Sequence, residues 1–129
     1  MYIDWTLTKI INSVGYQFPV LLITGPRQVG KTTCLQLSAD SDRAYVTMDD
    51  TKERVMAKSE PELFLQRYPG PILIDEIQYA PELLPYIKMA VDRGRKKGEF
   101  WLTGSQQFHL MAGVTESLAG RVGHAFWPG

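Results

Sequence analysis

The sequence predicts one α/β domain in which helices cover both faces of a parallel sheet. Segments with helical spacing alternate with short apolar runs, and this alternation is typical of a doubly wound sheet. Several runs are apolar at consecutive rather than alternate positions, as expected for strands that are buried on both faces. Ligands of such sheets bind beyond the carboxyl ends of the strands. The five runs expected to be strands are bounded by Gly, Pro or Asp and cover residues 18–24, 44–48, 71–75, 100–103 and 121–127.

Helices are expected between these strands and before the first of them. Apolar residues recur at near-helical spacing over residues 5–14, between a possible N-cap at Asp4 and a stop at Gly15. Residues 83–91 form a second apolar face, with the regular helix expected to begin near residue 84, and residues 31–39 are expected to form the helix after the first strand. Ser59 and Glu62 have the spacing of a capping box, which predicts a helix that begins there and precedes the third strand. We find no internal repeat, linker or low-complexity segment.

Composition narrows the class of protein. A chain of 129 residues with 44% apolar residues is long enough for one domain with its own core. Its 14 basic and 14 acidic side chains cancel, so a nucleic acid or anionic membrane would need a local patch to bind. Cys34 is the only cysteine, which excludes an intrachain disulfide and a cysteine zinc cluster. With no run long enough for a membrane span or a signal peptide, we expect a cytoplasmic protein without a membrane partner.

The stretch LLITGPRQVGKTTCLQL contains a phosphate-binding signature. Gly25, Gly30, Lys31 and Thr32 satisfy G-x-x-x-x-G-K-S/T between a predicted strand and a predicted helix. The glycines allow backbone N–H groups to surround a phosphate, and the helix N-terminus adds its positive end. Lys31 is expected to contact the β- and γ-phosphates, and the Thr32 hydroxyl to ligate a bridging Mg²⁺. The alternative, an ordinary strand-to-helix turn, does not account for this context.

Two acids follow the third apolar run. Asp75 is at the expected strand end and Glu76 comes next. Asp75 could hold the hydration shell of Mg²⁺, and Glu76 could accept a proton from an attacking water. An acidic strand end that caps the next turn is the alternative. The phosphate-binding signature favours the functional interpretation.

Polar residues after the fourth strand and a basic residue before the fifth are further candidates. Thr103, Ser105 and Gln106 are expected near the two acids, and Ser105 is the first choice for sensing a γ-phosphate or orienting water. Ser105 equally suits the N-cap of the following helix. Arg121 follows a helical stretch that ends at Gly120, and it could stabilise a phosphoryl group of a neighbouring subunit. An ion pair between elements is an equal alternative for it.

Other features are assigned to structure. The basic run at 93–97 could contact DNA or RNA, but the neutral chain and the lack of interleaved aromatics favour a solvated helix end. Asp49 and Asp50 could approach a magnesium shell, but they equally suit the turn and N-cap before TKERVMAK. His109 and His124 are isolated and have no metal-ligand spacing, and Cys34 is expected to pack as a small apolar residue.

The stretches GPRQVGKTT, ILIDEIQYAPELLPYIK, WLTGSQQFHLM and ESLAGRV resemble a large family of prokaryotic AAA-type P-loop ATPases. This resemblance covers nearly the whole chain and implies a RecA/AAA-like three-layer sandwich with a five-stranded parallel sheet in the order 5-1-4-3-2. The resemblance implies that Asp75 binds magnesium and that Glu76 is the catalytic glutamate. It also implies that Ser105 senses the γ-phosphate and that Arg121 is the arginine finger. The nucleotide-binding residues that it implies are Gly25, Pro26, Arg27, Gln28, Val29, Gly30, Lys31, Thr32 and Thr33.

The resemblance also bears on domain organisation and activity. Family members usually continue into a helical lid and a C-terminal domain of uncharacterised function, so residues 1–129 are expected to be an ATPase core without them. We expect ATP binding and magnesium-dependent hydrolysis that drive a switch or motor step. A nucleotide-gated binding module with negligible hydrolysis is the alternative, and a small-molecule P-loop kinase ranks behind both. Adenine specificity rests on the resemblance alone. A homo-oligomer is expected only if Arg121 acts as a finger in a neighbouring subunit. The client is not identified.

Overall fold

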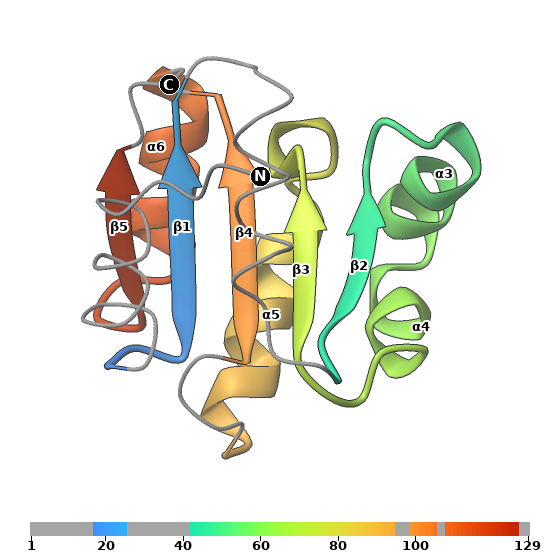
Figure 1. Ribbon diagram of the computed structural model, residues 1–129, viewed down its shortest axis with the longest axis horizontal. Coiled ribbons are helices and arrows are strands. Elements are labelled where there is room, and N and C mark those ends of the chain that lie inside the picture. Colours follow the sequence, from blue (N-terminus) through green and yellow to red (C-terminus); the bar gives the residue numbers. More distant parts are fainter. Residues whose placement is uncertain (1–16, 26–41, 95–98, 106–107, 127–129) are drawn as a thin grey trace, which may run out of the picture.

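The structure, a computed structural model, describes residues 17–25, 42–94, 99–105 and 108–126. Its five strands form one parallel sheet in the order β2-β3-β4-β1-β5 (Figure 1). This is the order 5-1-4-3-2 read from the other edge, so the predicted sheet is confirmed. The strands are β1 (Val20–Thr24), β2 (Ala44–Thr47), β3 (Ile72–Asp75), β4 (Phe100–Gly104) and β5 (Val122–Phe126).

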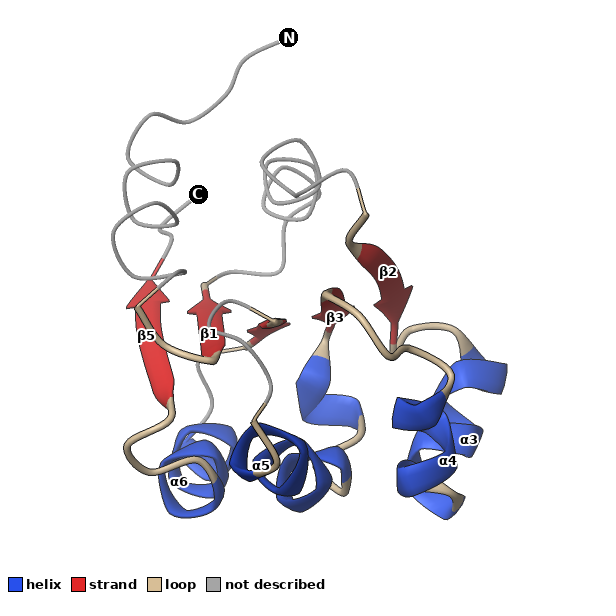
Figure 2. Cartoon of the chain, turned by 90° about the horizontal axis from the view of Figure 1, so that it is seen from below, coloured by secondary structure: helices blue, strands red, loops and turns tan. Residues whose placement is uncertain are grey.

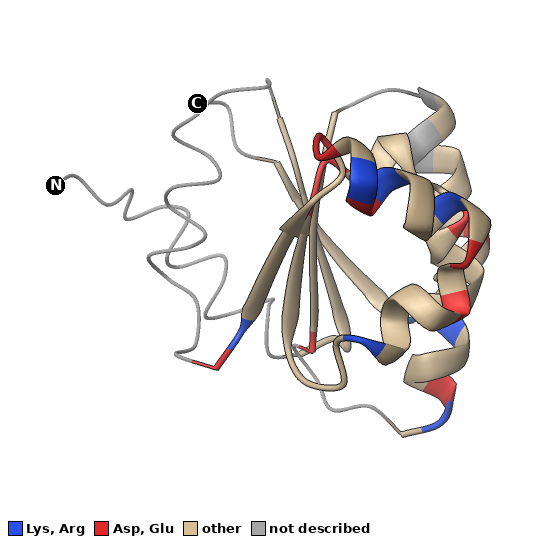
Figure 3. Ribbon diagram, turned by 90° about the vertical axis from the view of Figure 1, so that its right-hand side faces the viewer, with Lys and Arg blue, Asp and Glu red and all other residues tan. Residues whose placement is uncertain are grey.

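All four described α-helices lie on one face of this sheet (Figures 2 and 3). A short 3-10 helix, η1, follows β3 directly. The predicted helices at 5–14 and 31–39 lie outside the described residues, so helical cover of the second face stays a prediction. The helices and the 3-10 helix are α3 (Thr51–Ser59), α4 (Pro61–Gln66), η1 (Ile77–Tyr79), α5 (Leu83–Asp92) and α6 (Phe108–Ser117).

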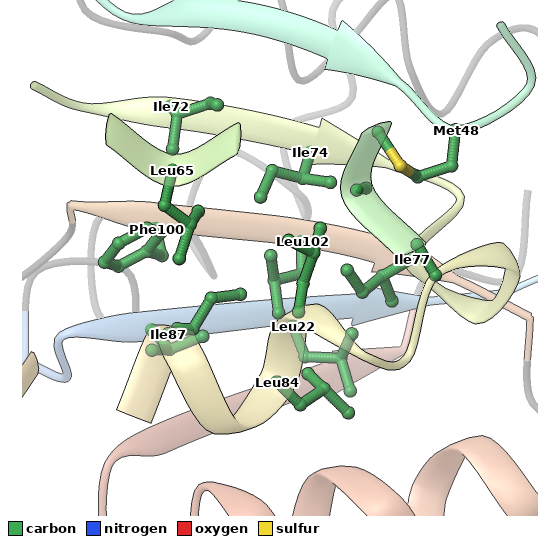
Figure 4. Packing of buried hydrophobic residues seen from close by; sticks show 14 of the residues in the cluster. Leu22, Met48, Leu65, Ile72, Ile74, Ile77, Leu84, Ile87, Phe100 and Leu102 are labelled. Carbon is green, nitrogen blue, oxygen red and sulfur yellow. The ribbon is translucent and has the colours of Figure 1, made fainter. Parts of the chain in front are cut away.

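The central strands are buried along their whole length. Every residue of β1, β3 and β4 is buried, as the consecutive apolar pattern predicts for strands covered on both faces. Side chains of adjacent strands, such as Leu22 and Leu102, pack with Leu84 and Ile87 of α5 in the main core (Figure 4). Burial on both faces leaves the strand ends as the places where polar groups can be presented.

Within the described residues, no helix is long and apolar enough to cross a membrane.

The register brings the carboxyl ends of three strands together. β1 lies between β4 and β5, and Ile23 is level with Thr103 of β4. β3 lies on the other side of β4, with Ile74 level with Leu102, and Thr47 of β2 is level with Asp75. Figure 1 shows all five strands ending at the same edge. The residues that follow β1, β3 and β4 therefore meet at that edge.

One predicted helix start is wrong. Ser59 is the last residue of α3, and its Oγ donates a hydrogen bond to the carbonyl of Val55 (2.7 Å) instead of capping a new helix. The N-cap of α4 is Glu60, which makes no side-chain capping bond. Pro61 sets the start of α4, because its fixed φ suits the first helical position and it has no N–H to satisfy. The capping-box spacing of Ser59 and Glu62 is therefore coincidental.

Both ends of α5 agree closely with expectation, whereas α6 ends at Ser117, before the expected end at Gly120. α5 begins at Leu83, one residue before the expected start at residue 84. It ends at Asp92, so the basic run at 93–97 begins at a helix C-terminus, as predicted, although residues 95–97 lie outside the described part of the chain. Gly120 has a φ of 77°, a conformation that glycine adopts without strain, between α6 and β5.

Asp50 is the N-cap of α3, which confirms the structural interpretation of this residue. Its Oδ1 accepts hydrogen bonds from the backbone N–H groups of Lys52 (2.9 Å) and Glu53 (3.4 Å). These are two of the N–H groups that the first helical turn cannot pair internally.

Replacing Asp50 with alanine is expected to lower the free energy of unfolding by about 1 kcal/mol, because both capped N–H groups lose their acceptor. Urea unfolding followed by circular dichroism measures this change. Asp50→Asn is the matched control, since it retains a side-chain oxygen acceptor and should stay close to the original stability. Equal losses for the two variants would show that the negative charge, and not the cap, is what matters.

Candidate functional site

Asp75 ends β3 with a buried carboxylate that neighbouring strands hold from two sides. Its side chain is only 6% exposed. Oδ1 accepts a hydrogen bond from the Thr103 hydroxyl of β4 (2.5 Å), and Oδ2 accepts one from the Tyr45 hydroxyl of β2 (3.1 Å). Donors on both flanking strands therefore fix the orientation of this carboxylate.

Tyr45 is a site residue that the sequence did not reveal. Burial and the adjacent Asp75 carboxylate raise the pKa of Tyr45 to about 12. The phenol therefore stays protonated at neutral pH and remains a hydrogen-bond donor to Asp75. Tyrosine within a strand is common, and its role becomes visible only once β2 is known to lie beside β3.

A single buried hydroxyl connects both acids to β4. The Thr103 side chain is fully buried, and its Oγ1 accepts a hydrogen bond from the backbone N–H of Glu76 (2.9 Å) while it donates to Asp75. Of the three polar residues that the sequence offered at this strand end, Thr103 is thus the one that contacts both acids. Ser105 reaches them only indirectly, and Gln106 lies outside the described residues.

Glu76 has an unusual backbone conformation. Its φ of 61° and ψ of 52° are left-handed, and among the described residues it is the only non-glycine with a positive φ. Such a conformation costs about 1–3 kcal/mol for a residue with a side chain and occurs preferentially at functional sites. The side chain is 4% exposed, and its Oε2 accepts a hydrogen bond from the Gln78 amide (Nε2, 2.6 Å). Backbone and carboxylate are therefore both held.

Gln78 and Ser105 extend this network to the end of β4. The amide oxygen of Gln78 accepts a hydrogen bond from the backbone N–H of Ser105 (3.3 Å). The Ser105 hydroxyl oxygen is buried and makes no hydrogen bond within the described part of the structure. Sequence reasoning selected Ser105 but not Gln78, although Gln78 stands only two residues after Glu76.

The predicted phosphate-binding loop begins at this same edge. Gly25 follows β1 directly and is buried. The hydroxyl of Thr24 is hydrogen-bonded with Nε2 of His124 (2.7 Å), which ties the end of β1 to β5 and agrees with the structural role expected for this histidine. The predicted nucleotide-binding residues that lie outside the described residues are Pro26, Arg27, Gln28, Val29, Gly30, Lys31, Thr32 and Thr33.

Arg121 lies at the opposite edge of the sheet, just before the amino end of β5. Its Nε donates to Oδ1 of Asp92 (2.7 Å), its Nη2 to Oδ2 of Asp92 (3.3 Å), and its Nη1 to the carbonyl of Ala119 (2.7 Å). The hydrogen bonds from Arg121 and from Lys88 lower the pKa of Asp92. Within one chain, Arg121 is therefore engaged at the end of α5 and is not brought to Asp75 and Glu76.

The donor chemistry of the site fits Mg²⁺ bound through a carboxylate. No group of three or more His, Cys, Asp and Glu side chains in the described ranges could by itself hold a metal ion. Mg²⁺ does not need one, because it keeps several waters and usually takes only one or two protein carboxylates. The rigidly held oxygens of Asp75 suit that coordination, and Thr32, the second predicted ligand, lies outside the described residues.

Replacing Thr103 with valine is expected to lower the free energy of unfolding by about 1–3 kcal/mol. The shapes are similar, but the buried groups of Asp75 and Glu76 would lose their shared partner. Chemical denaturation gives the value. Thr103→Ser keeps the hydroxyl and should lose less, about 1 kcal/mol for the missing methyl group. If the valine variant is as stable as the serine variant, the hydroxyl does not organise this edge.

Comparison with known proteins assigns the chain to a family. A family model described as AAA domain matches residues 17–128. Two curated relatives, uncharacterized protein Rv2008c of Mycobacterium tuberculosis and uncharacterized protein Mb2031c of Mycobacterium bovis, are each 37% identical over 107 residues. The alignment covers 83% of this chain but 24% of each relative, so the chain spans about a quarter of their length. Because the family model covers most of the chain and the sheet is that of a P-loop protein, this chain belongs to the AAA domain family of P-loop ATPase-like proteins.

Proposed function

We propose that this chain binds ATP and hydrolyses it with Mg²⁺, and that the cycle drives a conformational switch or a motor step. The buried Asp75–Glu76 pair is the observation that carries the proposal. It is held by β4 at the edge where β1 leads into the G-x-x-x-x-G-K-S/T segment. Two ordered acids beside a phosphate-binding segment suit phosphoryl transfer to water.

Each part of this edge has its own role in the proposal. Gly25 and the residues up to Thr33 bind the phosphates through backbone N–H groups, with Lys31 as the cation. Thr32 and Asp75 hold Mg²⁺, which neutralises part of the phosphate charge when bound. Tyr45 and Thr103 keep the Asp75 carboxylate in a fixed orientation, so little reorganisation is needed when the ion binds.

Glu76 is proposed as the general base. Its carboxylate is shielded from bulk solvent and its backbone is fixed by Thr103, so it can select one nearby water for deprotonation. Ser105 is proposed to contact the terminal phosphate, because its buried hydroxyl makes no hydrogen bond in the described part of the protein. Its alternative role as the N-cap of α6 stays a prediction, since residues 106–107 are not described.

A nucleotide-gated binding module is the second candidate function. In this candidate, the hydrogen bond from Gln78 keeps the Glu76 carboxylate from accepting a proton, so that loss of Gln78 would speed hydrolysis instead of slowing it. Phosphate release from ATP and from GTP with Mg²⁺ separates the candidates, and it also tests the preference for adenine. The assay should include a longer chain with the length of the relatives, because this chain spans only part of them. ATP binding without phosphate release from either chain would favour the binding module.

Lys31→Ala is expected to abolish or greatly weaken binding of ATP with Mg²⁺, because the variant loses the ammonium group that is proposed to bind the negatively charged phosphates. Titration calorimetry measures the affinity, and circular dichroism checks that the fold is retained. Lys52→Ala, an exposed change on α3, is the matched control and should bind as the unmodified chain does. Unchanged affinity in Lys31→Ala would remove the central claim.

Glu76→Gln is expected to retain nucleotide binding while turnover falls by a factor of roughly a hundred or more, because the amide cannot accept the proton. Single-turnover phosphate release measures the chemical step directly. Glu62→Gln makes the same chemical change on the exposed surface of α4 and should leave turnover unchanged. Turnover of the Glu76 variant at the original rate would mean that another group is the base.

Arg121 is proposed to act on the nucleotide of a neighbouring subunit in a homo-oligomer. Arg121 lies at the opposite edge of the sheet from Asp75 and Glu76 of its own chain. It would therefore reach a phosphate only in the site of a neighbouring subunit. In the single chain the guanidinium is held by a partly exposed, bidentate ion pair with Asp92, so the role in trans requires it to exchange this carboxylate for a phosphate oxygen when subunits meet. A guanidinium of this kind contributes a factor of roughly a thousand or more to turnover.

A mixture of two inactive variants, Glu76→Gln and Arg121→Ala, is expected to regain part of the activity. The first supplies an intact arginine and the second an intact base, so complete sites form only where the two kinds of subunit meet. Phosphate release is measured as the mixing ratio changes, with light scattering to follow co-assembly. Co-assembled mixtures without activity would return Arg121 to a structural role as the ion-pair partner of Asp92.

A further inference from the structure

The Gln78 side chain connects the catalytic glutamate of the proposed reaction to the end of β4. Its Nε2 is 2.6 Å from Oε2 of Glu76, and its Oε1 is 3.3 Å from the backbone N of Ser105. We propose that Gln78 is a positioning residue that orients the Glu76 carboxylate and couples it to the contact that Ser105 makes with a terminal phosphate. This inference rests on the proposed ATPase function and adds a residue to which no step of the proposed reaction assigns a role.

The chemistry of its partners fixes the orientation of the Gln78 amide. An ionised carboxylate can only accept hydrogen bonds, and a backbone N–H can only donate one. The NH₂ group must therefore face Glu76 and the carbonyl oxygen must face Ser105, as the structure has them. A flipped amide would lose both bonds, so this connection has a single arrangement in the unliganded protein.

The backbone beneath Gln78 is anchored, so its side chain has little freedom to follow other movements. Gln78 lies in η1, between Ile77, which is fully buried, and Tyr79, which is partly buried. The N–H of Tyr79 donates to the Glu76 carbonyl (3.2 Å), and the N–H of Ala80 donates to the Ile77 carbonyl (3.0 Å). Because this backbone is held in place, a displacement at Ser105 has to be taken up by the side-chain amide of Gln78, and hence by the Glu76 carboxylate.

The buried hydroxyl of Ser105 is the group through which a bound phosphate would act on this connection. Ser105 Oγ has no hydrogen-bond partner within the described residues, and a buried hydroxyl without a partner costs free energy. A phosphate oxygen is an acceptor that can satisfy it. When that contact forms, the N–H of the same residue shifts against the Gln78 carbonyl, so phosphate occupancy and the orientation of Glu76 become linked.

Gln78→Met removes both hydrogen bonds while keeping the length of the side chain. We expect kcat to fall by roughly tenfold or more with KM for ATP nearly unchanged, because only the orientation of the base is lost. The Ser105 amide, measured by hydrogen exchange in the unliganded protein, is expected to exchange faster because its acceptor is gone. Gln66→Met, the same change at an exposed position of α4, is the matched control and should alter neither quantity.

In this proposal Gln78 is a relay, which passes a change at Ser105 on to Glu76. Coupling between Gln78 and Ser105 distinguishes this relay from a Gln78 that only supports Glu76. Ser105→Ala is combined with Gln78→Met, and kcat is measured for both single variants and for the double variant. A relay predicts that the double variant is little worse than the poorer single one, whereas independent roles predict that the two fold-losses multiply. Binding of a non-hydrolysable ATP analogue should slow exchange at the Ser105 amide in the unmodified chain and much less so in Gln78→Met.

The outcomes separate this inference from the function on which it rests. If the unmodified chain and its longer form neither bind nor hydrolyse ATP, the proposed function is wrong and the relay fails with it. If the unmodified chain turns over and Gln78→Met matches Gln66→Met, the ATPase function stands and the role of Gln78 is wrong. Multiplying losses in the double variant would leave Gln78 as a support for Glu76 without any link to Ser105, which also contradicts the proposal.

Discussion

The hydroxyl of Thr103 is the constraint on which the site depends. A hydroxyl with no solvent contact has to satisfy its donor and its acceptor within the protein. Thr103 does so with two partners at the end of the neighbouring strand β3, the Asp75 carboxylate and the backbone N–H of Glu76, the next residue. Because one atom makes both bonds, the two acids are positioned against β4 as a unit. A shift of β4 relative to β3 would disturb the proposed metal ligand and the proposed general base at the same time.

The buried sheet explains why this edge carries the chemistry. Every position of β1, β3 and β4 is occupied by a buried residue, so the strand interiors have no room for a solvated site. Parallel pairing brings the three carboxyl ends to one edge, where polar residues meet across large separations in sequence. The opposite edge is where Arg121 forms its partly exposed, bidentate ion pair with Asp92 at the end of α5. The sheet thus presents the two acids at one edge and Arg121 at the other.

Apolar patterning predicted the five strands because burial on both faces leaves a strong local signal, and the family resemblance supplied their order. Asp75 and Glu76 were recognisable because they directly follow such a strand. Tyr45 was not, since its contact with Asp75 spans 30 positions and depends on strand order. The Ser59 prediction was wrong because Pro61 outweighed a capping spacing that many sequences contain by chance. Local signals predicted elements, whereas long-range hydrogen bonds determined which side chains form the site.

The backbone conformation of Glu76 indicates that this position requires a carboxylate side chain. At a φ of 61° glycine would be free of the strain of about 1–3 kcal/mol that a residue with a Cβ carries. The hydrogen bond that its N–H donates to Thr103 of β4 and the one that its carboxylate accepts from Gln78 of η1 offset that cost. Glycine would fit this backbone without the strain, and an apolar side chain would need no buried hydrogen-bond donor, so neither the backbone nor the core requires an acid here. The arrangement is understandable if the carboxylate itself is needed there, as a general base requires.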